Sequence, residues 1–340
     1  MTKILKMRPP IVENPDGTPA KIQLPPICSI DDFFEQRLVE PPQLVEGVLH
    51  TGTKMILGGG SKSFKTWTLM DMAVALATGG KWLNFQCTES KVLFINMEIL
   101  PWFARKRFED IKIAKRVIGK MPNLHVWNLR GYAADIEKLE QHLIAGAEAG
   151  GYKTIILDPV YKVQGARDEN SNGDISELLN ALERITVELE AAVVFGHHFA
   201  KGNASGKYAI DRMSGAGAWA RDPDTIITMT PHKEEDCFTV EFILRNQSPV
   251  ESFVVRREHP LMVRVDDLDP NELREPGKKK TRTVDEIVYL LPDSGGVTAT
   301  EWMRLASEQE GIHKTRFYEL KKIAHDKGKV KEVDGKIYAI

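Results

Sequence analysis

Apolar runs of strand length alternate with amphipathic stretches of helical length through the first 230 residues, and this alternation restricts the fold more than any other feature. The apolar runs lie at residues 53–58, 91–98, 124–129, 153–159, 191–198 and 224–230. Helical stretches lie between several of them, at residues 66–78, 102–117, 135–149 and 174–190. Continuous apolarity is typical of strands buried on both faces, as in parallel sheets that helices cover. We therefore predict an α/β domain with a mainly parallel central sheet.

The pattern changes after residue 230, where two more strand-like runs follow each other closely. They lie at residues 237–245 and 252–258, and the short connection between them leaves no room for a helix. Strands joined in this way pair antiparallel. We expect the sheet to end in antiparallel strands.

Composition and charge argue against several classes of protein. With 42% apolar and 28% charged residues, the 340-residue chain can fill a core, so disorder along its whole length is not expected. A net charge of −2 predicts no general affinity for nucleic acid or anionic lipid. Cys28, Cys87 and Cys237 are too far apart to suggest a disulfide framework or a zinc site. Neither a membrane span nor a secretory signal is recognisable, and we expect a cytoplasmic protein.

The chain divides by composition into four parts. Residues 1–30 are rich in proline and read as an extended arm. The α/β pattern occupies residues 31–270, and a linker is expected at 271–282, where Pro276, Gly277 and three lysines interrupt any apolar periodicity. Residues 283–340 then form a small module. From Lys278 onward the chain has 13 Lys and Arg against 10 Asp and Glu, so this end is basic.

The strongest chemical signal is the glycine-rich loop that follows the first apolar run. Its candidate phosphate ligands are Gly59, Gly60, Ser61, Lys62, Ser63, Phe64, Lys65 and Thr66. A phosphate-binding loop turns backbone N–H groups inward and needs a lysine for the outer phosphates and a hydroxyl for Mg²⁺ at the start of a helix. Lys65 and Thr66 lie at those positions, and we expect ATP and Mg²⁺ as the ligands.

Phe64 departs from the usual pattern, because it stands where the last glycine of G-x-x-x-x-G-K-T belongs. The alternative interpretation is an ordinary glycine-rich turn with an exposed Lys-Thr pair. The apolar strand before the loop and the amphipathic helix after it favour phosphate binding. Lys62 fits either a phosphate contact or an exposed side chain.

Two carboxylates follow apolar runs further along the chain. Asp158 ends the run 153–159, where a residue that holds Mg²⁺ with Thr66 is expected, although an ordinary Asp-Pro turn would look the same. Glu98 ends the run 91–98 and is suited to activate a water molecule, although it could also be a strand-terminal glutamate facing solvent. Together they predict a metal partner, Asp158, and a catalytic base, Glu98.

The stretch from about residue 31 to 257 resembles the RecA-like ATPases of the plasmid RepA helicase type, and more distantly DnaB. The likeness rests on MILGGGSKSFKTW, VLFINME, IILDP, VVFGHH and MSGAGAWARDPDTIITM. In that family a large residue is found in place of the glycine, which makes Phe64 less unusual. The resemblance implies that Glu98 is the base, that Asp158 is the metal partner, and that a histidine, His197 or His198, senses the nucleotide.

The resemblance also suggests residues that act outside the phosphate loop. Arg245 ends an apolar run in a segment similar to one that presents a basic residue to the adjacent protomer in DnaB-like proteins. A surface arginine on an edge hairpin is the alternative. Lys201, Arg212 and Arg221 lie in or beside a glycine-rich stretch whose relatives touch single-stranded DNA, or they belong to a flexible surface loop.

The module at residues 283–340 reads as three helices and a hairpin around Asp334 and Gly335, and it resembles a winged helix. Its third helix, expected at residues 313–327, carries basic residues on one side: Lys314, Arg316, Lys321, Lys322 and Lys327. Such a helix could lie on duplex DNA, or the module could dock a protein.

These observations lead us to expect an ATP-hydrolysing protein that acts on DNA as a homo-oligomeric ring or filament. A replicative helicase or translocase of a plasmid, phage or other mobile element fits best. The alternatives are a nucleotide-switched DNA-binding or scaffold protein that unwinds nothing, and a mediator of recombination on single strands. No membrane partner is expected.

Overall fold

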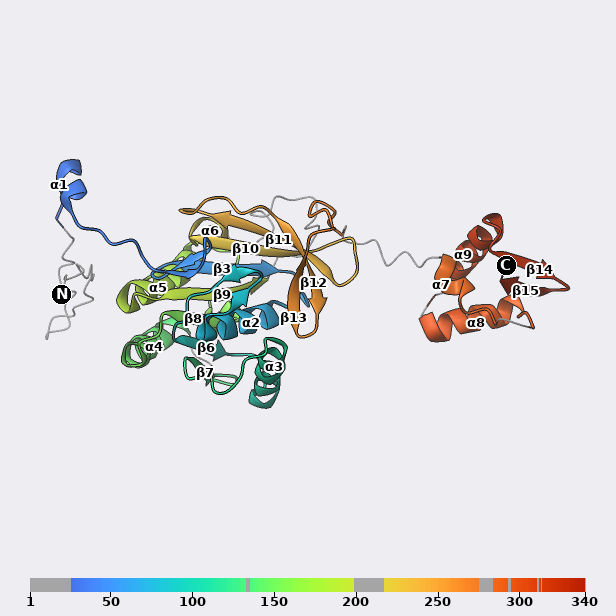
Figure 1. The fold of residues 1–340 in the computed structure, drawn as a ribbon, viewed down its shortest axis with the longest axis horizontal. Coiled ribbons are helices and arrows are strands. Elements are labelled where there is room, and N and C mark those ends of the chain that lie inside the picture. Colours follow the sequence, from blue (N-terminus) through green and yellow to red (C-terminus); the bar gives the residue numbers. More distant parts are fainter. Residues whose placement is uncertain are drawn as a thin grey trace. The chain divides into compact units, whose positions relative to one another are not determined.

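The computed structural model describes residues 26–132, 135–198, 217–274, 284–292, 295–310, 312 and 314–339 (Figure 1). The chain forms two compact units, Met1–Pro276 and Gly277–Ile340, and each is described by itself. None of the helices within the described residues is long and apolar enough to cross a membrane.

The first unit is built on a nine-stranded sheet with the order β13-β12-β11-β10-β3-β9-β8-β6-β7. Six strands of this sheet pair parallel to their neighbours: β3 (Lys54–Gly59), β6 (Val92–Asn96), β7 (Leu124–Asn128), β8 (Thr154–Asp158), β9 (Ala192–His198) and β10 (Thr225–Pro231). All six correspond to the apolar runs of the sequence, so the expected mainly parallel sheet is confirmed. Every residue of β3, β6 and β8 is buried, as continuous apolarity predicts.

Antiparallel strands complete the sheet on the side of β10. They are β11 (Cys237–Leu244), β12 (Phe253–Glu258) and β13 (Leu261–Val265). The first two confirm the expected antiparallel end of the sheet, whereas β13 was not anticipated from its short and partly charged run. The two edges of the sheet are therefore β13 and β7.

Helices cover both faces of the sheet (Figure 1). One face packs against α2 (Lys65–Thr78) and α3 (Pro101–Ala114), and the other against α4 (Ile136–Gly150) and α5 (Asn172–Leu189). Successive strand residues enter different cores: Leu57 packs on the side of α2, while Ile56 packs on the side of α5. A 3₁₀ turn, Val160–Val163, follows β8, and the short α6 (Ala218–Arg221) precedes β10.

Smaller elements lie around this core. Two hairpins, β1 (Gln43–Val45) with β2 (Leu49–His50) and β4 (Lys81–Trp82) with β5 (Phe85–Gln86), pack near α2. The helix α1 (Ile30–Glu35) begins with a capping box, in which Ser29 and Asp32 bond each other's backbone N–H groups. No residue of α1 is buried.

The second unit contains three helices and a hairpin around a separate core. Its elements are α7 (Val284–Val288), α8 (Ala299–Glu310), α9 (Lys314–Asp326), β14 (Val330–Val333) and β15 (Lys336–Ala339). Trp302 and Phe317 are fully buried and meet edge to face at 5.2 Å. Asp334 and Gly335 both have positive φ, as a tight hairpin turn requires.

Candidate functional site

The glycine-rich loop connects β3 to the first residue of α2, Lys65. A Cβ atom at Gly59 would lie 2.5 Å from Oγ of Ser63 and 3.1 Å from the carbonyl oxygen of Met229, so only glycine fits there. The Ser63 hydroxyl donates a hydrogen bond to the carbonyl of Gly60 at 2.8 Å, which closes the turn. The loop is thus folded tightly over the carboxyl ends of β3 and β10.

Phe64 is the N-cap of α2 and adopts the left-handed conformation with φ 60°, which glycine adopts most easily. Its ring packs edge to face on Phe238 at 5.9 Å, and the Arg257 guanidinium lies 4.0 Å from the ring centroid. These contacts from β11 and β12 hold the residue in a conformation that is unfavourable for a large side chain. The antiparallel strands therefore support the loop at the position where the usual glycine is missing.

Lys65 points back into the loop. Its Nζ donates to the carbonyl oxygens of Gly59 and Gly60, each at 2.9 Å, and lies 3.3 Å from Nδ1 of His198. Burial lowers the pKa of Lys65 to about 8, although the nearby carboxylates of Asp158 and Glu98 act in the opposite direction. A buried cation held by two carbonyls and an imidazole, with no carboxylate in direct contact, is ready to exchange these neutral partners for an anion.

Asp158 ends β8 and is 5% exposed. Burial raises its pKa to about 6, against a hydrogen bond from Thr66 and the charge of Lys65, which lower it. A Cβ atom at position 196 would lie 2.9 Å from Oδ1 of Asp158, so Gly196 on β9 leaves the space that the carboxylate occupies. Thr66 and Asp158 thus meet at the start of α2.

One hydroxyl and one carboxylate are a donor set suited to Mg²⁺ when phosphate oxygens and water supply the other ligands. Within the described residues there is no group of three or more His, Cys, Asp or Glu side chains that could hold a metal ion by themselves. A site at Thr66 and Asp158 therefore fits an ion that arrives with a nucleotide.

These side chains line a pocket of about 650 Å³. Its walls come from the loop, α2, α3 and the strand ends, and include Lys62, Ser63, Phe64, Lys65, Thr66, Glu98, Asp158 and His198. Glu98 is exposed and lies 3.5 Å from the Tyr161 hydroxyl, which donates to its carboxylate. The structure brings together most of the residues that the sequence predicted. Three of the predicted loop residues, Gly59, Gly60 and Ser61, are not among the lining residues.

Two basic residues of the pocket, Arg107 and Arg130, were not identified from the sequence. Arg107 lies on α3, with its guanidinium 4.9 Å from the ring of Trp67, and burial lowers its pKa while the charges of Asp158 and Glu98 raise it. Phe103, one turn earlier on the same helix, also lines the pocket. The sequence signal for Arg107 is its four-residue spacing from Phe103 on the helix after Glu98, because residues four apart lie on the same face of a helix.

The two adjacent histidines of β9 have different surroundings. His198 lines the pocket and approaches Lys65, and both burial and the charge of Lys65 lower its pKa. His197 is 4% exposed and stacks on Trp219 with 4.3 Å between the ring centroids. Because neighbouring strand residues face opposite ways, only His198 is positioned to sense a nucleotide within this pocket.

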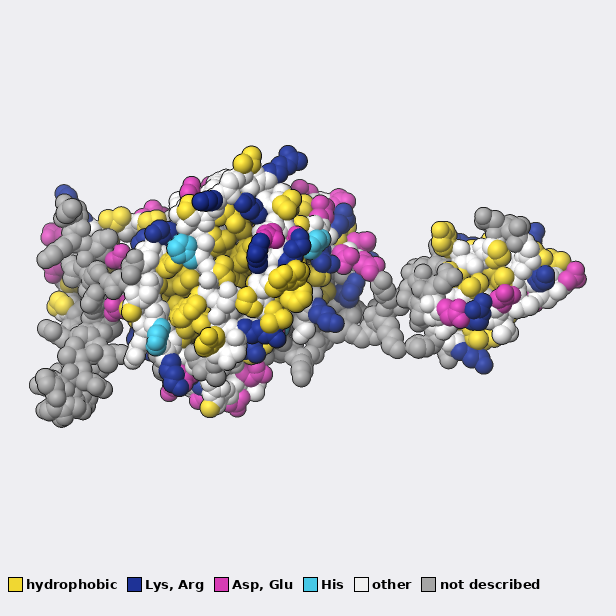
Figure 2. Space-filling view, turned by 90° about the horizontal axis from the view of Figure 1, so that it is seen from below, with side chains coloured by type: hydrophobic (Ala, Val, Ile, Leu, Met, Phe, Trp, Pro, Cys, Tyr) yellow, Lys and Arg dark blue, Asp and Glu magenta, His cyan; other side chains and the backbone are white. Residues whose placement is uncertain are grey.

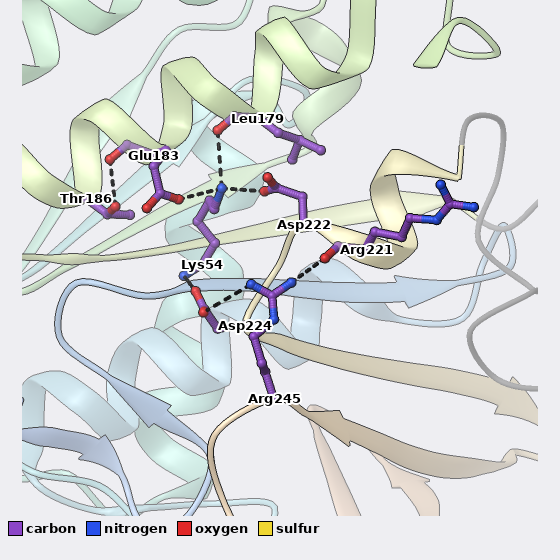
Figure 3. Close-up of polar contacts among 8 residues, drawn as sticks. All are labelled: Lys54, Leu179, Glu183, Thr186, Arg221, Asp222, Asp224 and Arg245. Carbon is purple, nitrogen blue, oxygen red and sulfur yellow. Dashed lines mark hydrogen bonds and ion pairs between the residues drawn. The ribbon is translucent and has the colours of Figure 1, made fainter. Parts of the chain in front are cut away.

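Arg245 lies outside the pocket, at the end of β11 (Figure 3). It forms an ion pair with Asp224 at 3.8 Å and donates to the carbonyl of Arg221. Lys54 lies beside it, buried among Glu183, Asp222 and the carbonyl of Leu179. Lys201 and Arg212 lie outside the described residues.

Of two similar solved structures, the first supports the fold. One solved structure, described as an ATPase domain, superposes with a TM-score of 0.50 at 12% identity, over 64% of this chain and 86% of that one. A KaiC-like protein from the hyperthermophilic archaeon Pyrococcus horikoshii OT3 gives a TM-score of 0.47 at 14% identity, over 66% and 94% of the two chains. No curated protein sequence matches the chain.

The resemblance to RecA-like P-loop ATPases, expected from the sequence, is confirmed at the level of the fold. The more specific likeness to plasmid RepA remains a prediction. A family model described as an AAA domain, AAA_25, matches residues 18–204, more than half of the sequence. The chain belongs to this AAA domain family of P-loop ATPases.

Proposed function

We propose that the protein hydrolyses ATP with Mg²⁺ and uses the reaction to act on DNA. The observation that carries the proposal is the convergence of Lys65, Thr66 and Asp158 in one pocket, where burial shifts the pKa of both charged groups. Perturbed groups of opposite charge at the end of a parallel sheet are typical of a phosphate-transfer site.

Each residue has a task that follows from its position. Lys65 leaves the carbonyls of Gly59 and Gly60 and contacts the outer phosphates. Thr66 and Asp158 would hold Mg²⁺, which would supply positive charge to the phosphate oxygens. Glu98 orients a water molecule and accepts its proton, and Arg107 neutralises the charge that develops on the transferred group.

Action on DNA is proposed from the second unit and from the family resemblance. Lys314 and Lys322 on α9 are exposed, as is Lys327 just after the helix, while Lys321 pairs with Glu332 at 3.5 Å. A row of basic side chains on one helix suits contacts with DNA phosphates, and the three helices with a hairpin suit a winged helix. Lys201, Arg212 and Arg221 are proposed to contact single-stranded DNA, and Arg245 to reach a neighbouring protomer.

A nucleotide-controlled switch is the second candidate, and Phe64 favours it. The residue is fixed by Phe238 and Arg257 in a left-handed conformation, so the loop has less freedom to adjust to a transferred phosphate. Such a protein would bind ATP, turn it over slowly and unwind nothing. The third candidate, a recombination mediator, would form filaments on single strands.

The deciding experiment measures ATP hydrolysis with and without single-stranded DNA, and unwinding of a forked duplex. The proposed function predicts hydrolysis that DNA stimulates, and strand separation that needs ATP. Hydrolysis without unwinding would favour the switch or the mediator. Absence of both ATP binding and ATP hydrolysis would contradict every version.

A further inference from the structure

Arg245 lies at the opposite end of the sheet from the nucleotide pocket of its own chain. Its backbone N–H donates to the carbonyl of Asp224, whose own N–H donates to the carbonyl of Lys54, and both bonds measure 3.0 Å. Lys54 begins β3, whereas Lys65 bonds to the carbonyl of Gly59, which ends β3. The six residues of this strand span about 17 Å. An arginine side chain is much shorter than this, so Arg245 cannot contact a phosphate held by Lys65 of the same chain.

The side chain of Arg245 is held at two points by the turn that leads into β10 (Figure 3). One terminal nitrogen forms an ion pair with Oδ1 of Asp224 at 3.8 Å, and the other donates to the carbonyl of Arg221. The side chain remains 50% exposed, and an exposed ion pair contributes little to stability. Contacts at two different nitrogens do, however, fix the direction in which a planar guanidinium points.

The carboxylate of Asp224 is itself fixed in place. Its Oδ2 accepts a hydrogen bond from the backbone N–H of Lys54 at 2.9 Å, while its Oδ1 faces Arg245. Asp222, in the same turn, pairs with the buried ammonium group of Lys54, which also contacts Glu183 on α5 at 2.6 Å. The turn is therefore tied to both β3 and α5. Asp224 offers Arg245 a carboxylate whose position does not depend on the arginine.

The mouth of the nucleotide pocket borders an apolar surface. Figure 2 shows the face of the first unit that carries β7 and α3, where hydrophobic side chains gather with Lys and Arg at the margin. Helix α3 connects this surface to the pocket, because Ala104 and Phe108 line a groove beside β7 while Phe103 and Arg107 line the pocket. Phe103 is 52% exposed. A second copy that reaches the pocket therefore buries apolar surface as well as charge, and apolar burial stabilises most contacts between chains.

We propose that Asp224 is a positioning residue, which holds the guanidinium of Arg245 in the direction needed to contact the outer phosphate of a nucleotide in the next copy of the chain. The amino end of β3 in one copy then faces the carboxyl end of β3 in the next, so the contact is head-to-tail. A small displacement of a group that contacts the reacting phosphate costs a large factor in rate. The inference rests on the proposed role of Arg245 and adds the residue that orients it.

A mixture of two inactive variants tests first whether Arg245 acts between copies. Lys65→Ala, the donor chain, supplies Arg245 but has an inactive pocket. Arg245→Ala, the acceptor chain, has an intact pocket but lacks the arginine. An equal mixture should hydrolyse ATP at least about tenfold faster than either variant alone, because about a quarter of the contacts pair a donor arginine with an acceptor pocket. If the mixture gains nothing, the inference falls together with the proposed role of Arg245.

Asp224→Asn, placed in one chain of the mixture at a time, then tests the positioning role. Asparagine can still accept the hydrogen bond from the N–H of Lys54, but it turns an N–H group toward Arg245. In the donor chain this substitution should lower the recovered rate at saturating ATP at least about tenfold. In the acceptor chain, which has no arginine to orient, it should change that rate less than about twofold. Asp222→Asn in the donor chain is the matched control, because Asp222 pairs with Lys54, and it should also change the rate less than about twofold.

Three results would overturn the inference while leaving the proposed function intact. The first is a recovered rate that Asp224→Asn in the donor chain does not change. The second is an equal loss when Asp224→Asn is placed in either chain, which a purely structural role or a failure to fold would produce. The third is an equal loss from Asp222→Asn in the donor chain, which would assign the effect to the turn as a whole and not to the contact of Asp224 with Arg245.

Discussion

The Nζ of Lys65 lies 3.3 Å from Nδ1 of His198, which joins the phosphate loop to the end of β9. Since burial and the charge of Lys65 lower the pKa of His198, the imidazole is neutral near pH 7 and accepts a hydrogen bond from the ammonium group. When Lys65 moves to a phosphate, His198 loses this partner. The pair therefore links occupancy of the loop to β9.

We expect the two histidines to respond differently to substitution. His198→Ala should slow ATP hydrolysis at least about tenfold if His198 senses the nucleotide. It should not weaken nucleotide affinity, because the contact that it removes belongs to the empty site. His197→Ala should instead lower the melting temperature by several degrees, since it removes a buried ring stacked on Trp219. Hydrolysis rates and thermal melts of both variants check this. The opposite pattern would assign the sensing role to His197.

The affinity for MgATP should be greatest between about pH 6 and pH 8. Lys65 has a pKa of about 8 in the empty site, and bound phosphates favour its charged form, so affinity should fall as pH rises above 8. Asp158 has a pKa of about 6, and Mg²⁺ needs the carboxylate, so affinity should also fall as pH drops below 6.

Calorimetric titrations across this range measure both limbs. Asp158→Asn is the control for the acid limb, because the phosphates themselves titrate near pH 6. If the affinity of Asp158→Asn falls equally steeply below pH 6, the fall is caused by protonation of the nucleotide and not of Asp158. Affinity that stays constant from pH 8 to 10 would contradict the role of Lys65.

Phe64→Gly should lower the free energy of unfolding by about 1–2 kcal/mol. Glycine removes a left-handed strain of about 1–2 kcal/mol, but the lost contacts of a half-buried phenyl ring with Phe238 and Arg257 outweigh that gain at about 3 kcal/mol. Urea denaturation measures the change. Phe64→Leu keeps the left-handed strain and some of the packing, so it separates the contribution of strain from that of packing. A stabilised Phe64→Gly variant would show that strain dominates.

We expect Glu183 and Asp222 to stabilise the buried ammonium group of Lys54 jointly. The ammonium group is buried, while its two partners are partly exposed, so either carboxylate alone can compensate the charge (Figure 3). Glu183→Gln and Asp222→Asn should each cost about 1 kcal/mol or less. The double variant should cost about 3–5 kcal/mol, because it leaves a buried charge without a carboxylate partner. Additive effects in a double-mutant cycle would contradict this.

The parallel sheet could be predicted because its strands are buried on both faces and therefore form continuous apolar runs. The strand β13 could not, since an edge strand needs apolar residues on one face only, and Met262 is its one buried residue. The phosphate loop was recognisable from its lysine and hydroxyl. The packing that holds Phe64 in place of the missing glycine could not be predicted. Its partners, Phe238 and Arg257, come from strands about 170 residues or more further along the chain.

The candidate site was predictable where a residue lies at or just after the end of a strand, as Asp158 on β8 and Glu98 after β6 do. Arg107 reaches the pocket from the middle of a helix, and its neighbours in sequence are other basic residues on the exposed side. The choice between His197 and His198 depended on which face of β9 looks toward Lys65, and this is set by the pairing of β9 with β3 and β8.

The central claim, that the loop before α2 binds the phosphates of ATP for hydrolysis, is tested most directly by the hydrolysis rate of Lys65→Ala beside Lys62→Ala. Both variants remove a lysine from the same loop, but Lys62 is exposed whereas Lys65 is buried against Gly59 and Gly60. We predict that Lys65→Ala loses at least about 99% of the hydrolysis, while Lys62→Ala stays within about threefold of wild type. Hydrolysis at the wild-type rate in Lys65→Ala would contradict the assignment of this site.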